Sequence, residues 1–394
     1  MSRSVAVLCL LTAVDMIGFG IVIPLLPYFG QHLGAGPFEI TVIIASFPAA
    51  QLLMSAVWGR MSDRRGRKPI LVAGLCASAV SYGVFANATS LTILLASRIL
   101  AGSAGATVGV AQAYIADLTD ARDRARGIGY LGAAYGVGVV VGPLIGVAAV
   151  QQGYGAVGWT AAAICAANAL AAHLFLPESR VANQDRTLPA IGTVIRRFMQ
   201  PPLRRVAVLY FLILSAYDGT MAIYALLYQQ TLEFGARDIA LLWGWAALVQ
   251  ILARAGLIGF ATRVLDEADV VALGGLLMFV GLGAAPFASS WSLAFLATTV
   301  GVVGSSLCLP TISSIISKTG DARSLGALMG SAQIIAGSAR VAGPMVLGLV
   351  FQLLGGPWAF LVAALAGLFG GGLARTRVVR ALTVSVVEPT GVGQ

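Results

Sequence analysis

Charge is scarce in this sequence. Asp, Glu, Lys and Arg make up 10% of the 394 residues and hydrophobic residues 58%, whereas roughly a quarter of a soluble domain is charged. The mean hydropathy of +0.89 is also too high for a water-soluble chain of this length. These values exclude a soluble globule and predict an integral membrane protein.

Residues that bind metals or attack substrates are equally sparse. The four cysteines lie in apolar stretches without a C-x-x-C pair, and the two histidines, His32 and His173, fall in a loop and near the end of a span. We therefore expect no disulfide framework, no metal site and no enzyme. No G-x-x-x-x-G-K-[ST] run is present, so the chain is expected to use neither ATP nor a cofactor.

Twelve apolar stretches are long enough to cross a membrane, since a ~30 Å hydrocarbon core takes about 20 helical residues. The first stretch is longer than the apolar region of a signal peptide and contains Asp15, so we interpret it as a retained span. The predicted fold is all-α, with transmembrane helices at 5–29, 41–58, 69–86, 91–116, 127–149, 156–176, 206–228, 238–261, 270–288, 291–316, 325–351 and 355–374.

Lys and Arg residues are distributed unevenly between the loops. Nearly all loop cations lie in alternate polar segments, starting before the first span, and the opposite loops contain only Arg237. Because positive loops stay cytoplasmic, we expect both termini inside the cell and a location in the plasma membrane. The net charge of +9 then reflects topology and contact with membrane lipids. It does not indicate binding to nucleic acid.

The longest polar stretch divides six spans from six. The halves share short motifs, because Asp120-Ala121-Arg122 and Gly142-Pro143 recur 201 positions later as Asp321-Ala322-Arg323 and Gly343-Pro344. Such a repeat is typical of transporters with a mid-membrane site between two related bundles. We predict an N-terminal six-helix bundle at 1–176, a cytoplasmic linker at 177–205, a C-terminal six-helix bundle at 206–376 and a cytoplasmic tail at 377–394.

The loop between the second and third spans concentrates five cations, one acid and two glycines within residues 59–69. We expect its glycines to permit a tight turn and its acid to cap or pair with another helix end. A positive turn that only sets topology would explain the cations, but not the acid or the glycines. We predict that this loop is a conformational latch, formed by Gly59, Asp63, Arg64, Gly66, Arg67 and Lys68.

The repeat, the spans and the loop together resemble the major facilitator superfamily, and within it the twelve-helix drug:proton antiporters and the tetracycline efflux proteins. The loop fits the family pattern G-x-x-x-D-R-x-G-R-[KR]. Further matches are the run from Ser97 to Gly102, Ile115-Ala116-Asp117, which adds Asp117 to the latch, and the glycine-rich run ending at Gly142-Pro143. The chain departs from the tetracycline proteins at Ser81, where an acid is expected, and in the ninth span, which has none.

Ionisable groups inside spans are costly, so each one is a functional candidate. Asp15 and Asp218 lie at nearly equivalent positions of the two halves, and a carboxylate beside a cavity can take up and release a proton. Arg98 keeps its proton, so its expected part in proton coupling is to tune a carboxylate or hold substrate. The alternatives are a helix cap or contact for each aspartate and a structural salt bridge for Arg98.

The fifth span carries glycines that permit close helix contact and a proline that invites a bend. The resemblance associates this element with antiport, although packing alone would also explain the glycines. The residues are Gly132, Gly136, Gly138, Gly142, Pro143 and Gly146.

Polar and aromatic side chains within spans suit either a cavity with apolar walls or contacts between helices. As substrate contacts we predict Gln51, Gln112, Tyr217, Met221, Tyr224, Trp243, Gln250, Arg254 and Gln333.

These observations, with the resemblance, predict a proton-coupled secondary active transporter, monomeric and bacterial, that exports a drug or other small organic compound by alternating access. One alternative is a proton-coupled metabolite or sugar exporter, or a symporter, on the same scaffold. A receptor or scaffold that transports nothing is the alternative of another class. Charges within the spans argue against it, because a scaffold has no use for them.

Overall fold

The computed structural model describes residues 3–179, 203–318, 325–376 and 379. Most of the predicted linker at 177–205, almost all of the predicted tail at 377–394 and the repeated motif Asp321-Ala322-Arg323 lie outside these ranges. The secondary structure within them is helical throughout.

The helices of the first half follow one another with short connections. They are α1 (Arg3–Val22), the 3-10 turn η1 (Ile23–Leu25), α2 (Leu26–His32), α3 (Pro37–Arg65), α4 (Arg67–Ala86), α5 (Leu91–Gly105), α6 (Val108–Leu118), α7 (Ala121–Val150) and α8 (Tyr154–Phe175).

The second half contains the same kind of elements. They are α10 (Leu203–Leu232), α11 (Ala236–Leu252), the π-helical segment η2 (Ala253–Leu257), α12 (Ile258–Val264), α13 (Glu267–Ala284), the 3-10 turn η3 (Ala285–Phe287), α14 (Trp291–Lys318), α15 (Leu325–Leu354) and α16 (Gly356–Ala374).

Joined across their breaks, the described helices form twelve segments long and apolar enough to cross a membrane. The predicted number of spans is confirmed, and each predicted span overlaps an observed one. The chain is therefore an all-α, multi-pass membrane protein.

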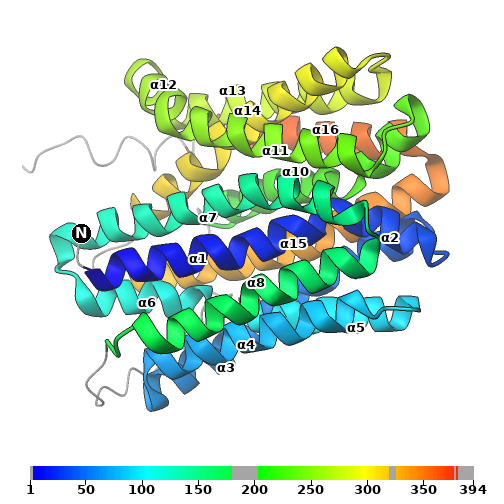
Figure 1. Cartoon of the computed structure of the whole chain (residues 1–394). Coiled ribbons are helices and arrows are strands. Elements are labelled where there is room, and N and C mark those ends of the chain that lie inside the picture. The colour runs from blue at the N-terminus through cyan, green and yellow to red at the C-terminus, as the bar shows by residue number, and fades with distance from the viewer. Residues whose placement is uncertain (1–2, 180–202, 319–324, 377–378, 380–394) are drawn as a thin grey trace, which may run out of the picture. The chain divides into compact units, whose positions relative to one another are not determined.

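The chain divides into two compact units. Unit 1 comprises Met1–Arg186 and Glu233–Ala247, and unit 2 comprises Thr187–Leu232 and Leu248–Gln394. In unit 1, α1 packs on α7 and α8, and α4 packs on α5 and α8 (Figure 1). In unit 2, α10 packs on α15 and α16, and α13 packs on α14 and α16.

The fourth span is interrupted between α5 and α6, and α3 supplies the side chains that stabilise the break. The amide of Gln51 donates to the carbonyl of Gly105 at 3.0 Å, and the indole of Trp58 donates to the carbonyl of Ser103 at 2.6 Å. Carbonyls left free at a helix end need such partners inside a membrane. Gln51 therefore has a structural task in unit 1.

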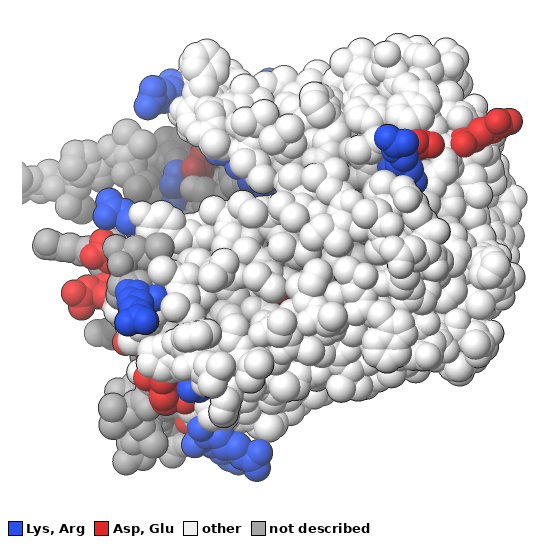
Figure 2. Space-filling view, in the orientation of Figure 1, with Lys and Arg blue, Asp and Glu red and all other residues white. Residues whose placement is uncertain are grey.

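The outer surface matches a lipid environment. On the face shown in Figure 2, charged side chains gather near the helix ends, and the flank between them is almost free of charge. Large apolar side chains are exposed on many of the described helices, and Leu53 is 75% exposed. In a water-soluble protein so much exposed apolar surface would cause aggregation, whereas in a bilayer it faces acyl chains.

Candidate functional site

A cavity of about 200 Å³ lies within unit 1. Among the described residues of its lining, Asp15 of α1 is the one charged residue and Gln112 of α6 is the one amide. Thr12, Thr107 and Tyr135 add hydroxyl groups, and most of the remaining wall is aliphatic. A few polar groups in an apolar wall are typical of a binding site for a small organic molecule.

Asp15 is half-buried and has only weakly polar or neutral neighbours. Its Oδ1 lies 4.0 Å from the Sγ of Cys165 on α8, and the side chain of Ser78 on α4 hydrogen-bonds to it. Within the described residues, no Lys or Arg forms an ion pair with Asp15. The carboxyl group can therefore lose its charge without leaving a partner cation unpaired.

The glycines of α7 bring it directly onto α1, next to Asp15. A Cβ at Gly142 would overlap the backbone of Gly20, and a Cβ at Gly138 or Gly146 would overlap the α1 backbone in the same way. These three glycines make the close contact expected of them. The seam fixes the height of Asp15 beside the cavity.

The remaining residues of this group do not all lie in the seam. A Cβ at Gly132 would meet nothing within 4 Å, and this glycine lines the cavity. Gly136 is half-buried in α7. Pro143 lies inside α7 directly after Gly142 and also packs against Gly20.

Arg98 of α5 is fully buried and has no acidic partner among the described residues. Its Cζ lies 5.6 Å from the ring centroid of Tyr82 and 5.1 Å from that of Phe85. Its Nε donates weakly to the Oγ of Ser97 at 3.4 Å, and its two terminal nitrogens lack a hydrogen-bond partner within the same ranges. Two aromatic faces attract the guanidinium, but they do not replace the hydrogen bonds that it loses on burial.

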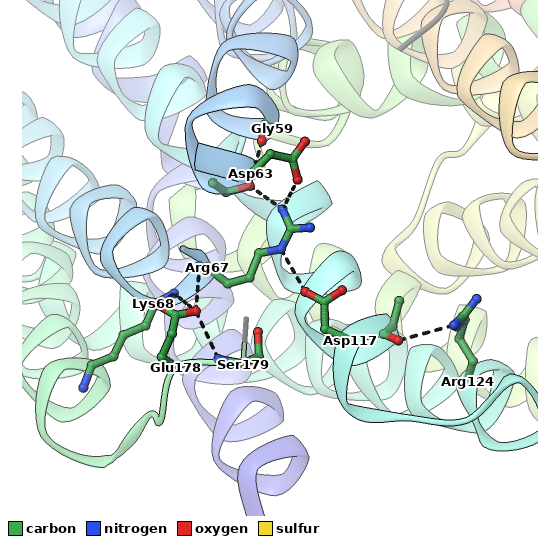
Figure 3. Close-up of polar contacts among 10 residues, drawn as sticks. Gly59, Asp63, Arg67, Lys68, Asp117, Arg124, Glu178 and Ser179 are labelled. Carbon is green, nitrogen blue, oxygen red and sulfur yellow. Dashed lines mark hydrogen bonds and ion pairs between the residues drawn. The ribbon is translucent and has the colours of Figure 1, made fainter. Parts of the chain in front are cut away.

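The predicted latch centres on Arg67, the first residue of α4 (Figure 3). Its Nη1 lies 2.9 Å from Asp63 Oδ1, and its Nε lies 3.1 Å from Asp117 Oδ2 at the end of α6. The same Nη1 donates to the Oγ of Ser62 at 2.6 Å. With 10% of its side chain exposed, Arg67 joins α3, α4 and α6.

Glu178, directly after the sixth span, completes the latch and was missed from the sequence. Its carboxylate accepts the backbone N–H of Arg67 at 2.8 Å and that of Lys68 at 3.2 Å (Figure 3). Gly66 has φ +98°, and a Cβ there would overlap this carboxylate. An acid next to a span is a usable signal in a chain so poor in charge, but the sequence does not show which helix end it meets.

The other latch residues have smaller parts. Gly59 lies inside α3, not in the turn, and a Cβ there would meet nothing within 4 Å. Our expectation that both glycines form the turn is therefore wrong for Gly59. Arg64 is exposed and Lys68 is half-buried.

In unit 2 the predicted residues form two polar contacts. Asp218 Oδ2 lies 3.8 Å from the Nε of Arg340 on α15, a partner that the prediction did not include. The amide of Gln250 donates to the hydroxyl of Tyr217 at 2.9 Å. Tyr224 is 1% exposed and packs edge-on against Phe360, so it belongs to the core of unit 2.

The remaining predicted substrate contacts are not among the described residues that line the cavity of unit 1. Met221 of α10 and Trp243 of α11 are half-buried, Arg254 is exposed in the π-helical segment η2, and Gln333 of α15 is exposed. Within the described residues, no three His, Cys, Asp or Glu side chains converge as a metal site would require.

The comparisons with known proteins agree with this architecture. The tetracycline resistance protein of class C from Escherichia coli is 28% identical over 352 residues, which cover 87% of this chain and 88% of that protein. Multidrug resistance protein 1 from Bacillus subtilis is 27% identical over 358 residues, covering 90% and 91%. The solved structure of the human organic anion transporter MFSD10 matches with a TM-score of 0.70 and 23% identity, over 95% of this chain and 99% of that one.

The sequence profile described as Major Facilitator Superfamily matches residues 8–267, which is more than half of the chain. Together with the twelve spans and these relatives, the match shows that the chain belongs to the major facilitator superfamily and is a membrane transporter of small molecules.

Proposed function

We propose that this transporter is a proton-coupled antiporter that exports drug-sized organic compounds by alternating access. The carrying observation is the cavity in unit 1, whose one ionisable carboxylate has no cation partner among the described residues. The names of the tetracycline and multidrug resistance relatives support the substrate class. We further propose that it acts as a monomer in a bacterial plasma membrane, with both termini cytoplasmic and without a cofactor.

Asp15 is the group that exchanges proton for substrate in this mechanism. When ionised, it attracts a basic or polar group of the substrate, and when protonated it releases that group. The cavity is about 200 Å³, smaller than the ~300–1,000 Å³ typical of drug-sized ligands. It therefore accommodates one part of the substrate next to Asp15, and the rest of the molecule extends beyond it.

One proton supplies enough energy for useful export. A membrane potential of 100 mV provides about 2.3 kcal/mol per charge, which corresponds to roughly a 40-fold gradient at ~1.4 kcal/mol per tenfold. Arg98, which lies over the ring of Tyr82 with its terminal nitrogens unpaired within the described part of the chain, provides a fixed positive charge in the same unit. The two residues together constitute the proposed proton-coupling group of unit 1.

A transport assay in proteoliposomes tests this function. Tetracycline and a lipophilic cationic dye are added outside vesicles that contain a pH-sensitive dye, and antiport moves protons against the direction of the substrate. Asp15→Asn should abolish this movement. Asp123→Asn is the matched control, because Asp123 is 67% exposed at the start of α7 and has only a long ion pair of 3.6 Å.

The outcomes separate the alternatives. Protons that move with the substrate would identify a symporter on the same scaffold. Full proton exchange by the Asp15→Asn variant would remove Asp15 from the mechanism. A drug-susceptibility panel in a host without its own efflux pumps extends the search to other compounds, and a chain that moves none of them would be a receptor or scaffold.

A further inference from the structure

Unit 2 contains an ion pair at the positions that correspond to Arg67 and Asp117. Gly74 of α4 and Gly274 of α13 lie 200 positions apart and have equivalent contacts. A Cβ at Gly74 would approach the carbonyl of Ala104 in the fourth span, and a Cβ at Gly274 would approach the carbonyl of Gly304 in the tenth. This places Glu267, the first residue of α13, where α4 has Arg67.

The second member of the pair follows from the other repeat. The motif at 120–122 recurs 201 positions later, which places Lys318 of α14 where α6 has Asp117. Lys318 Nζ lies 2.7 Å from Glu267 Oε1, and Ser314 Oγ donates to the same oxygen at 2.7 Å. The side chain of Glu267 is 16% exposed and that of Lys318 34%. The pair is thus retained between the halves with its charges exchanged.

The exchange changes how each pair interacts with the helix ends. A helix N-terminus carries partial positive charge and a C-terminus partial negative charge. Glu267 at the start of α13 and Lys318 at the end of α14 both match these charges. Arg67 at the start of α4 and Asp117 near the end of α6 both oppose them.

The latch of unit 1 compensates with other groups. Glu178 brings the negative charge that the start of α4 needs, and it does so from the segment after α8. Asp63 and Ser62 of α3 hold the guanidinium of Arg67. The latch therefore depends on four separate segments, and moving any one of them removes part of its support. The pair in unit 2 needs only two neighbouring helices.

We infer that Glu267 and Lys318 are positioning residues that keep α13 fixed to α14 throughout transport, whereas the Arg67 latch opens and closes. Two spans precede the third and eight precede the ninth, and because both numbers are even, the two pairs lie at the same side of the membrane. One side of the transporter thus has a permanent clamp in the second half and a releasable latch in the first. This inference rests on the alternating access of the proposed function.

Hydrogen exchange of the full-length protein in lipid, without substrate, tests the difference. Peptides that cover the first two turns of α13 should exchange about tenfold more slowly than those of α4, since Glu267 favours the positive end of its helix and Arg67 opposes that of α4. Equal exchange at the two helices, or slower exchange at α4, would overturn the inference.

Charge-exchange variants isolate the cause. Glu267→Lys with Lys318→Glu keeps the pair but opposes both helix ends, so exchange at the start of α13 should accelerate about tenfold, as for the latch of unit 1. Exchange at α4 should not change. Protection as in the unaltered protein would show that the pair alone matters and that our argument from the helix ends is wrong.

The same variant reports on function. If the clamp must stay closed, the turnover of the charge-exchanged variant in the proteoliposome assay falls while tetracycline binding is retained. The variant with Glu267→Gln and Lys318→Gln, which lacks the ion pair, should give the same result. Unchanged turnover, despite faster exchange, would refute the positioning role. Hydrogen exchange is measured without substrate and does not depend on proton antiport. The comparison of α4 with α13 therefore remains interpretable even if the unaltered protein shows no proton antiport.

Discussion

Substituting Gly66 by Ala should disrupt the latch of unit 1 through two separate effects. Gly66 has φ +98° and ψ 162°, a backbone region that is nearly restricted to glycine and costs other residues about 1–3 kcal/mol. The new Cβ would also overlap the carboxylate of Glu178. Displacing that carboxylate removes its bonds to the N–H groups of Arg67 and Lys68, and the loss of such a helix cap costs about 1 kcal/mol. The sum is about 2–4 kcal/mol.

A double-mutant cycle separates these effects. Glu178→Ala alone should cost about 1 kcal/mol, because Glu178 is exposed and solvent screens its charge. In the Gly66→Ala, Glu178→Ala double variant no carboxylate is left for the new Cβ to overlap. The backbone strain then remains, and the loss of the helix cap is counted once instead of twice. The double variant should therefore be at most as unstable as Gly66→Ala, with a coupling of about 1 kcal/mol between the two sites.

The assay is reversible unfolding by SDS in mixed micelles, followed by the fluorescence of the six tryptophans. Gly59→Ala is the matched control, because Gly59 lies within α3 and its Cβ would meet no atom within 4 Å. This control should be neutral or stabilised by about 0.5–1 kcal/mol. Strictly additive effects of Gly66→Ala and Glu178→Ala would refute the contact, and a destabilised Gly59→Ala would refute our assignment of the turn to Gly66 alone.

Two further substitutions test the α1–α7 seam and the buried arginine. Gly142→Ala should destabilise the protein by about 1–3 kcal/mol, because the new Cβ overlaps the backbone of Gly20. Gly132→Ala, with open space around it, should not destabilise the protein. Equal effects of the two substitutions in the SDS titration would contradict the seam. Arg98→Met should leave the stability unchanged or raise it, since it removes a buried charge whose terminal nitrogens have no partner among the described residues, and should abolish proton exchange in proteoliposomes. A large loss of stability would show that Arg98 has a structural role.

The spans could be predicted because their signal is local. An apolar run of sufficient length is sufficient evidence for a transmembrane helix, and the seam of α7 follows from the spacing of its glycines. Arg67 was identified with its loop. Its arrangement with Asp63, four residues earlier, is also a local property of the helix ends.

The contacts missed from the sequence join residues far apart in the chain. Glu178 meets Arg67 across 111 positions. Arg340 lies near Asp218, and no pattern in the sequence relates these two positions. That no described acid pairs with Arg98 was equally hidden, because a missing contact leaves no trace in a pattern of residues. Gly59 was placed in the turn because glycine is favoured in turns and destabilises helix interiors, yet here it lies inside α3.

The two halves therefore share a backbone plan and differ in charge. In both, a glycine seam packs the first helix of the half on its fifth, through Gly20 with Gly142 and through Gly219 with Gly343. In both, an aspartate lies near this seam. Protonating Asp218 would remove the charge that lies 3.8 Å from Arg340, whose side chain is 45% exposed.

Protonating Asp15 breaks no such pair within the described ranges. A carboxyl group that must alternate between two charge states in each cycle functions best where neither state leaves an unpaired ion. Asp15 satisfies this condition among the described residues, whereas Asp218 has Arg340 as a neighbour. The same contrast holds at the helix ends, where the pair in unit 1 opposes the helix dipoles and the pair in unit 2 follows them. On the proposals made above, the first half combines the exchangeable carboxylate with the releasable latch, and the second half has the ion pair that follows the helix dipoles. If both properties serve transport, the moving and titrating parts of this protein are concentrated in one of its two repeats.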